Sequence, residues 1–297
     1  MGGSMGDDIL VNWLKLTLVK GLGPSRLLKL ISYFGSPKGI FSASNSELLR
    51  SRVFNETMLV DWDKLRNASD DSFVDAIRIC QENNIAIVPL FEDSYPKNLK
   101  NIPSPPKTLF MQGDLDLLNK KKIAIVGTRH PEKKALEWAE SASKAISDAG
   151  YVVVSGGALG IDTVAHFAAL KKGKTICVFG TGLLHYYPEE NRDLFAKIKN
   201  DGLIISEHLP SFRGNELAFK LRNRITSGIS NAIIVVATKE SGGSMTQARI
   251  AYEQRIPIFC PKLSLNLYPN EGIAHIIKSF GANEISSWDE VLDQIGE

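Results

Sequence analysis

Glycine-rich segments follow several apolar runs of this sequence, at places where free backbone amides are able to bind an anion. Two such runs, Ile123 to Val126 and Tyr151 to Val154, lie between Lys122 and Asp162, and apolar residues at helical spacing separate them. This pattern predicts a βαβ unit. Its second strand leads into Ser155, Gly156, Gly157 and Gly160, and Asp162 is expected to cap the next helix. A turn of this kind favours a phosphate.

Three further segments have the same character. They read GTR at Gly127 to Arg129, GTG at Gly180 to Gly182, and SGGS at Ser241, Gly242, Gly243 and Ser244. Each follows a predicted strand, and ligands of open α/β sheets bind at the carboxyl ends of the strands. We therefore expect all four turns to share one edge of a sheet.

The elements that must position these turns are apolar strands alternating with helical patterns. Continuous Val- and Ile-rich runs indicate strands covered on both faces, hence an α/β fold with a doubly wound, mainly parallel, Rossmann-like sheet. The predicted strands are 123–126, 151–154, 175–179, 203–206, 232–237 and 256–260.

Common phosphate-binding signatures are missing from the sequence. The first turn reads GTRHPE instead of GxGxxG, the second strand does not end in an acidic residue, and no GxxxxGK[ST] loop occurs. These absences argue against a dinucleotide-dependent oxidoreductase and a P-loop NTPase, and we expect no cofactor.

The segment from Asn215 to Ser230 is predicted to be a helix carrying Phe219, Lys220, Arg222 and Arg224. Guanidinium groups suit phosphate, and an aromatic ring stacks on an exposed base, so the segment suggests single-stranded nucleic acid. A solvated helix with a buried Phe is an equally weighted alternative. Arg222 and Arg224 lie on different helical faces, so one of them can be structural.

No catalytic group assembles from the sequence. Ser155 lacks the GxSxG context, and Asp162 is better explained as a helix cap than as an acid. His166 follows Asp162 by one helical turn, but such a pair is more often structural. The five histidines lack metal-ligand spacing, so we expect no metal.

Bulk properties describe an ordinary cytoplasmic protein. The net charge is only +2, so charge alone implies neither nucleic acid nor an acidic surface. There is no apolar segment long enough for a membrane span and no signal-peptide pattern. The odd number of well-separated cysteines, Cys80, Cys177 and Cys260, makes disulfides unlikely and suggests buried thiols. Residues 1–4 resemble an expression scar.

Two domains are expected. Residues 5–82 read as a small helical domain whose GLGPS segment, Gly21 to Ser25, resembles a helix-hairpin-helix that can hold a DNA phosphate; a purely structural αα-hairpin is the favoured alternative. Residues 83–297 form the α/β domain, entered through a proline-rich connector.

Several motifs, in this order along the chain, resemble the DNA-processing protein A family, also called Smf. They are AIVGTR at 124–129, SGGALGIDTVAHFAAL at 155–170, YPEENRDL at 187–194, FKLRNRITSGIS at 219–230 and SGGSMTQARIAYEQ at 241–254. The resemblance extends to the connector and the helical domain, and so covers nearly the whole chain.

This resemblance implies an extended Rossmann domain preceded by a SAM-like helical domain, and a homodimer that is not an enzyme. It also implies binding of single-stranded DNA and loading of RecA recombinase onto incoming DNA in natural transformation. Carried over by motif, the DNA-contacting candidates are Arg129, Ser155, Gly156, Gly157, Phe219, Lys220, Arg222, Asn223, Arg224, Ser241, Gly242, Gly243 and Ser244.

The sequence departs from the family pattern in two places. Leu159 stands where the family commonly has a basic residue, so one phosphate contact is missing or is supplied by Lys171 or Lys174. The winged-helix domain that many members carry is not expected here.

Two rival functions remain open. One is a sensor or scaffold that binds a small nucleotide in the same crevice. The other is a phosphoribohydrolase related to the cytokinin-activating enzymes, but Arg249 stands where their PGGxGTxxE loop has its catalytic Glu.

Overall fold

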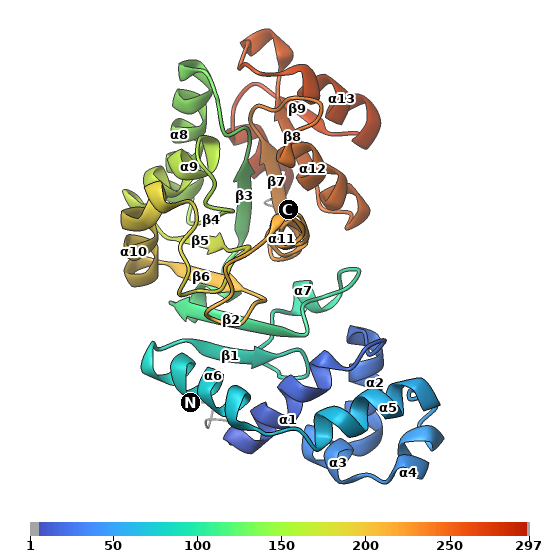
Figure 1. The fold of residues 1–297 in the computed structure, drawn as a ribbon. Coiled ribbons are helices and arrows are strands. Elements are labelled where there is room, and N and C mark those ends of the chain that lie inside the picture. Colours follow the sequence, from blue (N-terminus) through green and yellow to red (C-terminus); the bar gives the residue numbers. More distant parts are fainter. Residues whose placement is uncertain (1–5, 296–297) are drawn as a thin grey trace. The chain divides into compact units, whose positions relative to one another are not determined.

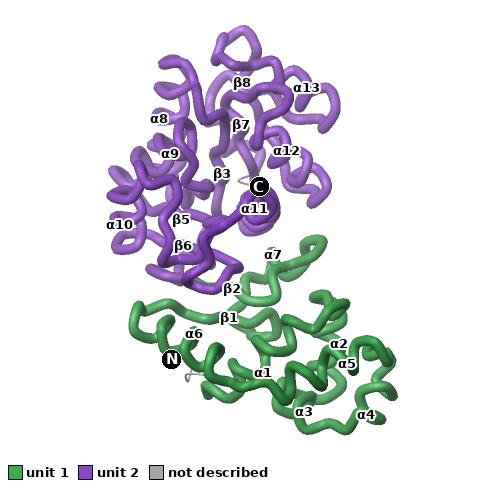
Figure 2. Tube along the Cα trace, in the orientation of Figure 1, with its two compact units in different colours: residues 1–110 green, residues 111–297 purple. Residues whose placement is uncertain are grey.

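The computed structural model describes residues 6–295, and the predicted scar at residues 1–4 lies outside them. The chain divides into two compact units, residues 1–110 and residues 111–297 (Figure 2). The predicted helical domain was placed at 5–82. The last of the first six helices does end at Glu82, while the compact unit continues to Phe110.

The first unit is mainly helical. Gly23 and Pro24 begin the second helix, with Pro at its first position, and Ser44 with Glu47 forms a capping box on the fourth. Trp13 and Trp62 are fully buried in this unit. Its elements are α1 (Asp7–Leu18), α2 (Pro24–Phe34), α3 (Pro37–Ser42), α4 (Asn45–Arg50), α5 (Glu56–Arg66), α6 (Asp71–Glu82), β1 (Ala86–Pro89) and α7 (Lys97–Lys100), followed by the start of β2 (Thr108–Gly113).

The second unit is an α/β domain with alternating strands and helices. Its further strands are β3 (Lys122–Val126), β4 (Val152–Ser155), β5 (Thr175–Val178), β6 (Leu203–Ser206), β7 (Ala232–Val235), β8 (Ile258–Pro261) and β9 (Asn283–Ile285). Its helices are α8 (Lys133–Asp148), α9 (Ile161–Leu170), α10 (Arg192–Asp201), α11 (Glu216–Gly228), α12 (Gly243–Glu253), α13 (Glu271–Phe280) and α14 (Asp289–Ile295), with 3₁₀ turns η1 (Leu115–Asn119), η2 (Glu189–Asn191) and η3 (Leu263–Leu265).

Within the described residues the sheet has nine strands in the order β1-β2-β6-β5-β4-β3-β7-β8-β9. Every pair from β6 to β9 is parallel. The chain moves outward from β3 to β6 and then returns to β7 on the other side of β3. Such a reversal is the place where open α/β sheets form a ligand crevice.

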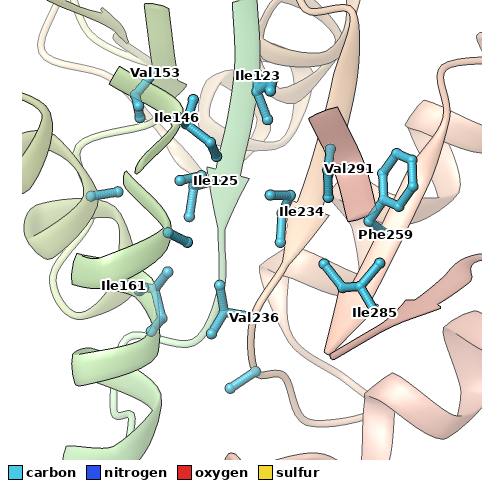
Figure 3. Packing of buried hydrophobic residues seen from close by; sticks show 14 of the residues in the cluster. Ile123, Ile125, Ile146, Val153, Ile161, Ile234, Val236, Phe259, Ile285 and Val291 are labelled. Carbon is cyan, nitrogen blue, oxygen red and sulfur yellow. The ribbon is translucent and has the colours of Figure 1, made fainter. Parts of the chain in front are cut away.

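Helices cover both faces of this sheet, with α8, α9 and α10 on one side and α11 and α12 on the other (Figure 1). Strands β3 to β8 are buried along their whole length, which explains their continuous apolar sequences. Ile123 and Ile125 of β3 pack with Ile146 of α8 and Ile234 of β7 in a hydrophobic core cluster (Figure 3). The predicted fold class is therefore confirmed.

The cysteines Cys80, Cys177 and Cys260 are all buried free thiols. Among the described residues, no helix has the length and apolar character that a membrane span needs.

Candidate nucleic-acid interface

A pocket of about 680 Å³ lies where β3, β4 and β7 end, in the second unit. One wall is the helix α11, and another is the turn that begins α12. The position agrees with the strand reversal between β3 and β7. The lining residues are Val126, Gly127, Thr128, Arg129, His130, Gly156, Ala158, Asp162, Tyr187, Glu216, Phe219, Lys220, Arg222, Asn223, Thr238, Lys239, Ser241, Gly242, Gly243, Ser244, Thr246 and Gln247.

The turn 241–244, which we call the open turn, presents unbonded amides to this pocket. Gly242 caps α12 and Gly243 begins it. Within residues 6–295, the backbone amides of Ser241, Gly243 and Ser244 donate no hydrogen bond. The Ser244 side chain is turned inward, where Oγ donates to Thr238 Oγ1 at 2.7 Å. Free amides at the positive end of an eleven-residue helix favour an anion.

The turn 155–160, which we call the closed turn, already holds an anion from its own chain. Asp162 Oδ2 accepts hydrogen bonds from the amides of Gly156 at 3.2 Å and Ala158 at 3.3 Å. The predicted cap role of Asp162 is therefore wrong: Gly160, with a φ of 83°, precedes the helix, and Asp162 lies in the first turn. Ser155 is fully buried, and its Oγ donates to Ile125 O at 2.7 Å.

Arg222 lies beneath the closed turn. Its side chain is buried, and Nη1 donates to Val178 O at the end of β5 at 2.7 Å. A Cβ at Gly156 would lie 1.7 Å from the same Nη1, so only glycine leaves room for the guanidinium. Burial raises the pKa of Asp162, and the nearby positive charge of Arg222 opposes that rise. Burial also lowers the pKa of Arg222 itself.

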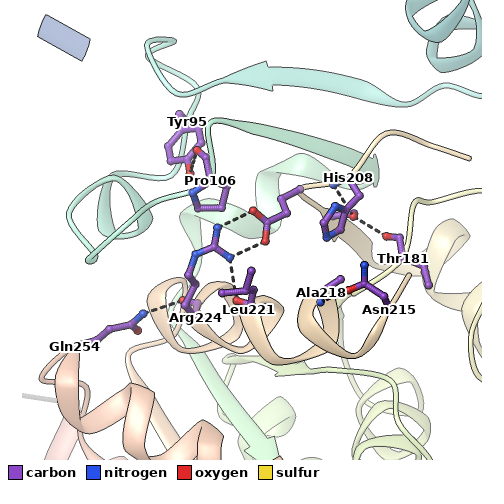
Figure 4. Close-up of polar contacts among 11 residues, drawn as sticks. Tyr95, Pro106, Thr181, His208, Asn215, Ala218, Leu221, Arg224 and Gln254 are labelled. Atoms are coloured by element: carbon purple, nitrogen blue, oxygen red, sulfur yellow. Dashed lines mark hydrogen bonds and ion pairs between the residues drawn. The ribbon is translucent and has the colours of Figure 1, made fainter. Parts of the chain in front are cut away.

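Arg224 points away from the pocket. Its two terminal nitrogens each donate to a carboxylate oxygen of Glu207 at 2.6 Å, and Nη1 also donates to Leu221 O at 2.9 Å (Figure 4). Gln254 donates to Arg224 O at 3.0 Å. These bonds hold the second half of α11 in place, so Arg224 supports the wall of the pocket.

Phe219 is the aromatic ring of the pocket. It is half-buried, its centroid is 5.2 Å from that of the exposed Tyr187, and a Cβ at Gly180 would lie 2.5 Å from its Cδ1. The GTG turn thus packs behind Phe219 instead of lining the pocket. Of the four turns expected at one edge of the sheet, GTG is the one that contributes no residue to the pocket lining.

The cations of the pocket differ in their partners. Lys220 Nζ is 2.7 Å from Glu216 Oε1, and both side chains are exposed. Arg129 and Lys239 are exposed, and neither side chain has a hydrogen-bond or ion-pair partner among residues 6–295. Two exposed cations of the pocket lining are therefore available to a ligand.

Most residues that the sequence singled out meet at this pocket. Asn223 lines it from α11, where its carbonyl accepts from Gln247 Nε2 at 2.9 Å. Ser155, Gly157 and Arg224 do not line it. At Gly157 the carbonyl accepts from Asn191 Nδ2 at 3.0 Å, and a Cβ would collide with Phe195 and Cys177.

Sequence reasoning missed Tyr187, Thr238 and Lys239. Lys239 and Thr238 directly precede the SGGS turn, and Tyr187 opens the YPEENRDL motif, so proximity to a recognised motif was the available signal. His166 does not hydrogen-bond to Asp162. Its Nδ1 lies 2.7 Å from Thr175 Oγ1, inside the domain.

Lys171 and Lys174 do not replace the basic residue missing at Leu159. Lys171 follows the last residue of α9, at the helix end opposite Leu159, and it pairs with Glu140 at 3.4 Å. Ten helical residues separate the two ends by roughly 15 Å. Lys174 directly precedes β5, at the amino edge of the sheet.

An open α/β sheet with an amide-lined, cationic pocket at its strand reversal is the architecture typical of Rossmann-like proteins that bind anionic ligands. The family described as DNA recombination-mediator protein A matches residues 86–296, and the chain belongs to this family. Among its curated relatives, the DNA processing protein DprA of Bacillus subtilis is 38% identical over 219 residues, which are 73% of each chain. Protein Smf of Synechocystis is 32% identical over 289 residues, covering 96% of this chain and 72% of the relative.

Solved structures agree with this assignment. DprA from Streptococcus pneumoniae superposes with a TM-score of 0.80 at 30% identity, covering 95% of this chain and 97% of that chain. DprA from Helicobacter pylori, described for its single-stranded DNA binding mode, has a TM-score of 0.65 at 30% identity and covers 71% of this chain and 95% of its own. The predicted family resemblance is confirmed.

Proposed function

We propose that this chain binds single-stranded DNA in the pocket between α11 and α12 and acts as a recombination mediator. The observation that carries the proposal is the grouping of the unbonded amides of Ser241, Gly243 and Ser244 with Arg129 and the ring of Phe219 on one pocket. Amides and a guanidinium suit phosphate, and the ring suits an unpaired base. The Helicobacter relative, described as binding single-stranded DNA, supports the same assignment.

The residues that we propose to contact DNA are fewer than those drawn from the sequence. Arg129, Lys220 and Lys239 neutralise phosphates, the open turn donates amides, and Phe219 with Tyr187 stacks on bases. Asn223 lines the same wall. Ser155, Gly157 and Arg224 lie outside the pocket and act by shaping the turns and α11. Gly156 and Arg222 line the pocket but are packed against each other, and Arg222 donates to Val178 O.

Affinity for a fluorescent oligo-dT, measured by anisotropy at several salt concentrations, tests the proposal. Two or three phosphates neutralised by these cations predict a slope of log K against log salt of about −1.4 to −2.1, with weaker binding to duplex. No binding of single strands at low salt, with duplex bound at least as well, would contradict it.

We further propose that the chain is a cytoplasmic homodimer that protects incoming strands and loads RecA onto them during natural transformation. Family membership supports this role. RecA filament assembly on single strands coated with single-strand-binding protein should accelerate when this protein is added, and light scattering should give twice the chain mass. If the rate of RecA filament assembly did not change, the proposed loading of RecA would be wrong, but the proposed DNA binding would stand.

We propose that the pocket acts by binding and not by catalysis. Its carboxylates are engaged, since Asp162 accepts two amides and Glu216 pairs with Lys220. Arg249, which stands where the related hydrolases have their glutamate, pairs with Glu253 outside the pocket. Release of free base from nucleoside monophosphates would contradict this proposal.

Binding of a free nucleotide is the second candidate, favoured by the pocket volume of about 680 Å³, which lies in the range of small-molecule sites. Calorimetry with mononucleotides and with short oligo-dT separates the two. Equal affinities would favour the nucleotide, and a strong preference for the oligonucleotide would favour DNA.

A further inference from the structure

The closed turn has the shape of an anion site but contains a carboxylate of the same chain. The Gly156 and Ala158 amides converge on one oxygen of Asp162, at 3.2 and 3.3 Å. Converging amides of this kind form an anion-binding concavity. Asp162 lies in the pocket wall with only 6% of its surface exposed, so its carboxylate is part of the surroundings that a ligand in the pocket would meet.

Arg222 supplies a positive charge close to the closed turn. It packs against Gly156, donates to Val178 O at 2.7 Å, and is 91% buried, with Nε lacking a partner among the described residues. A buried carboxylate without a nearby cation would be costly. Asp162 and Arg222 therefore compensate each other, and Arg222 contributes little net charge to the pocket.

Side chains beyond Asp162 hold the closed turn in this conformation. Asn191 Nδ2 donates to Gly157 O at 3.0 Å and to Thr163 Oγ1 at 2.8 Å, and Thr163 Oγ1 donates to Ala158 O at 2.8 Å. The turn is thus fixed independently of any ligand. Opening it for a phosphate would require displacing Asp162 from a turn that these bonds keep rigid.

We propose that Asp162 determines where phosphate binds in this pocket: it serves as a built-in anion that closes one glycine turn and directs the ligand phosphate to the other. The proposal rests on the proposed function for its ligand. It makes Asp162 a specificity-determining residue and Arg222 its internal counter-ion.

The variant Asp162→Asn tests this inference, because the amide side chain keeps an oxygen for the turn and removes the charge. Arg222 then becomes an uncompensated cation beside the ligand. We expect oligo-dT to bind about fivefold tighter at 0.1 M salt, with a salt slope steeper by about 0.7. A merely structural role for Asp162 would lower affinity and leave the slope unchanged, and that result would overturn the proposal.

Asp193→Asn is the matched control. Asp193 also lies in the first turn of a helix, α10, but it is exposed and does not line the pocket. The Asp193 variant changes the net charge by the same amount as the Asp162 variant. Because Asp193 lies outside the pocket, the affinity for oligo-dT and the salt slope should equal those of the unmodified protein. An equal gain in this control would show a general charge effect and overturn the proposal.

A measurement on the unmodified protein covers the case in which the Asp162 variant does not fold. Titration of ¹⁵N-labelled full-length protein with inorganic phosphate should shift the amide resonances of Gly243 and Ser244 and leave those of Gly156 and Ala158 in place. Equal shifts at both turns would overturn the proposal. If phosphate shifted the Gly243 and Ser244 resonances but the protein did not bind DNA, only the proposed function would be rejected.

Discussion

The closed turn and the open turn have similar sequences, SGG and SGGS, and both follow a buried parallel strand. They differ in what their amides bind. In the closed turn the Gly156 and Ala158 amides are bonded to Asp162, whereas in the open turn the Ser241, Gly243 and Ser244 amides have no partner among the described residues. Glycine content alone therefore does not show whether the amides of a turn are free. In this protein the difference is the carboxylate of Asp162, which accepts the amides of the closed turn.

The largest expected difference between the turns concerns stability. In Gly156→Ala the new methyl group displaces the buried guanidinium of Arg222 from Val178 O, which we expect to lower the free energy of unfolding by about 3 kcal/mol. Urea denaturation measures this change.

Gly243→Ala is the control in the open turn, because a Cβ there meets nothing within 4 Å. We expect a change below about 0.5 kcal/mol. Equal losses at the two glycines would show that the closed turn is no more tightly built than the open one.

The next effect is a loss of stability in acid, caused by His166 of α9, the helix that follows the closed turn. Burial, with a smaller contribution from Arg222, lowers the pKa of His166 from 6.5 to about 3. The unfolded chain therefore binds a proton between these values that the folded chain does not, so stability falls as the pH falls below about 6.5. We expect a loss of about 3 kcal/mol between pH 7 and pH 4.

His166→Gln removes this titrating side chain. Urea denaturation at several pH values should then show a smaller loss of stability between pH 7 and pH 4. The variant keeps a polar group near Thr175 Oγ1. An unchanged loss of stability at low pH would show that other groups cause it.

A smaller effect is expected at the aromatic side of the open turn. Phe219→Leu fills much of the space beside Gly180 but removes the stacking surface, so affinity for oligo-dT should fall about tenfold. Phe219→Tyr keeps a ring and should stay within about twofold of the original. Equal losses in both variants would indicate that packing, and not stacking, is responsible.

The smallest expected effect concerns Arg129, an exposed cation of the pocket whose backbone packs against Gly160 of the closed turn. Arg129→Gln should weaken oligo-dT binding about fivefold at 0.1 M salt and make the salt slope shallower by about 0.7. Arg249→Gln changes an arginine of α12 that lies outside the pocket, and should alter neither quantity. An unchanged slope in the Arg129 variant would mean that this guanidinium does not neutralise a phosphate.

The fold was predictable because its signals are local. Strands buried on both faces read as continuous apolar runs, as at Ile123 to Val126, and glycines mark where they end. The pocket position followed from the rule that ligands of such sheets bind at the carboxyl ends of the strands.

The roles of individual residues were less predictable, because they depend on contacts between distant segments. Helical spacing placed Arg222 and Arg224 on different faces, but it cannot show that the partners are Val178 O and Glu207. Asp162 resembled a cap because it stands at a helix start. In the structure its carboxylate instead accepts the amides of Gly156 and Ala158 in the preceding turn.

The bidentate pair between Arg224 and Glu207 limits how wide the pocket can become. Both side chains are largely shielded from water, with 14% and 17% exposed, so salt weakens their attraction little. To move α11 outward, a ligand would have to break two charge-assisted bonds at once. A thin, flexible chain with unstacked bases can lie beside α11 without moving it, whereas a bulky, stiff chain would have to displace this helix.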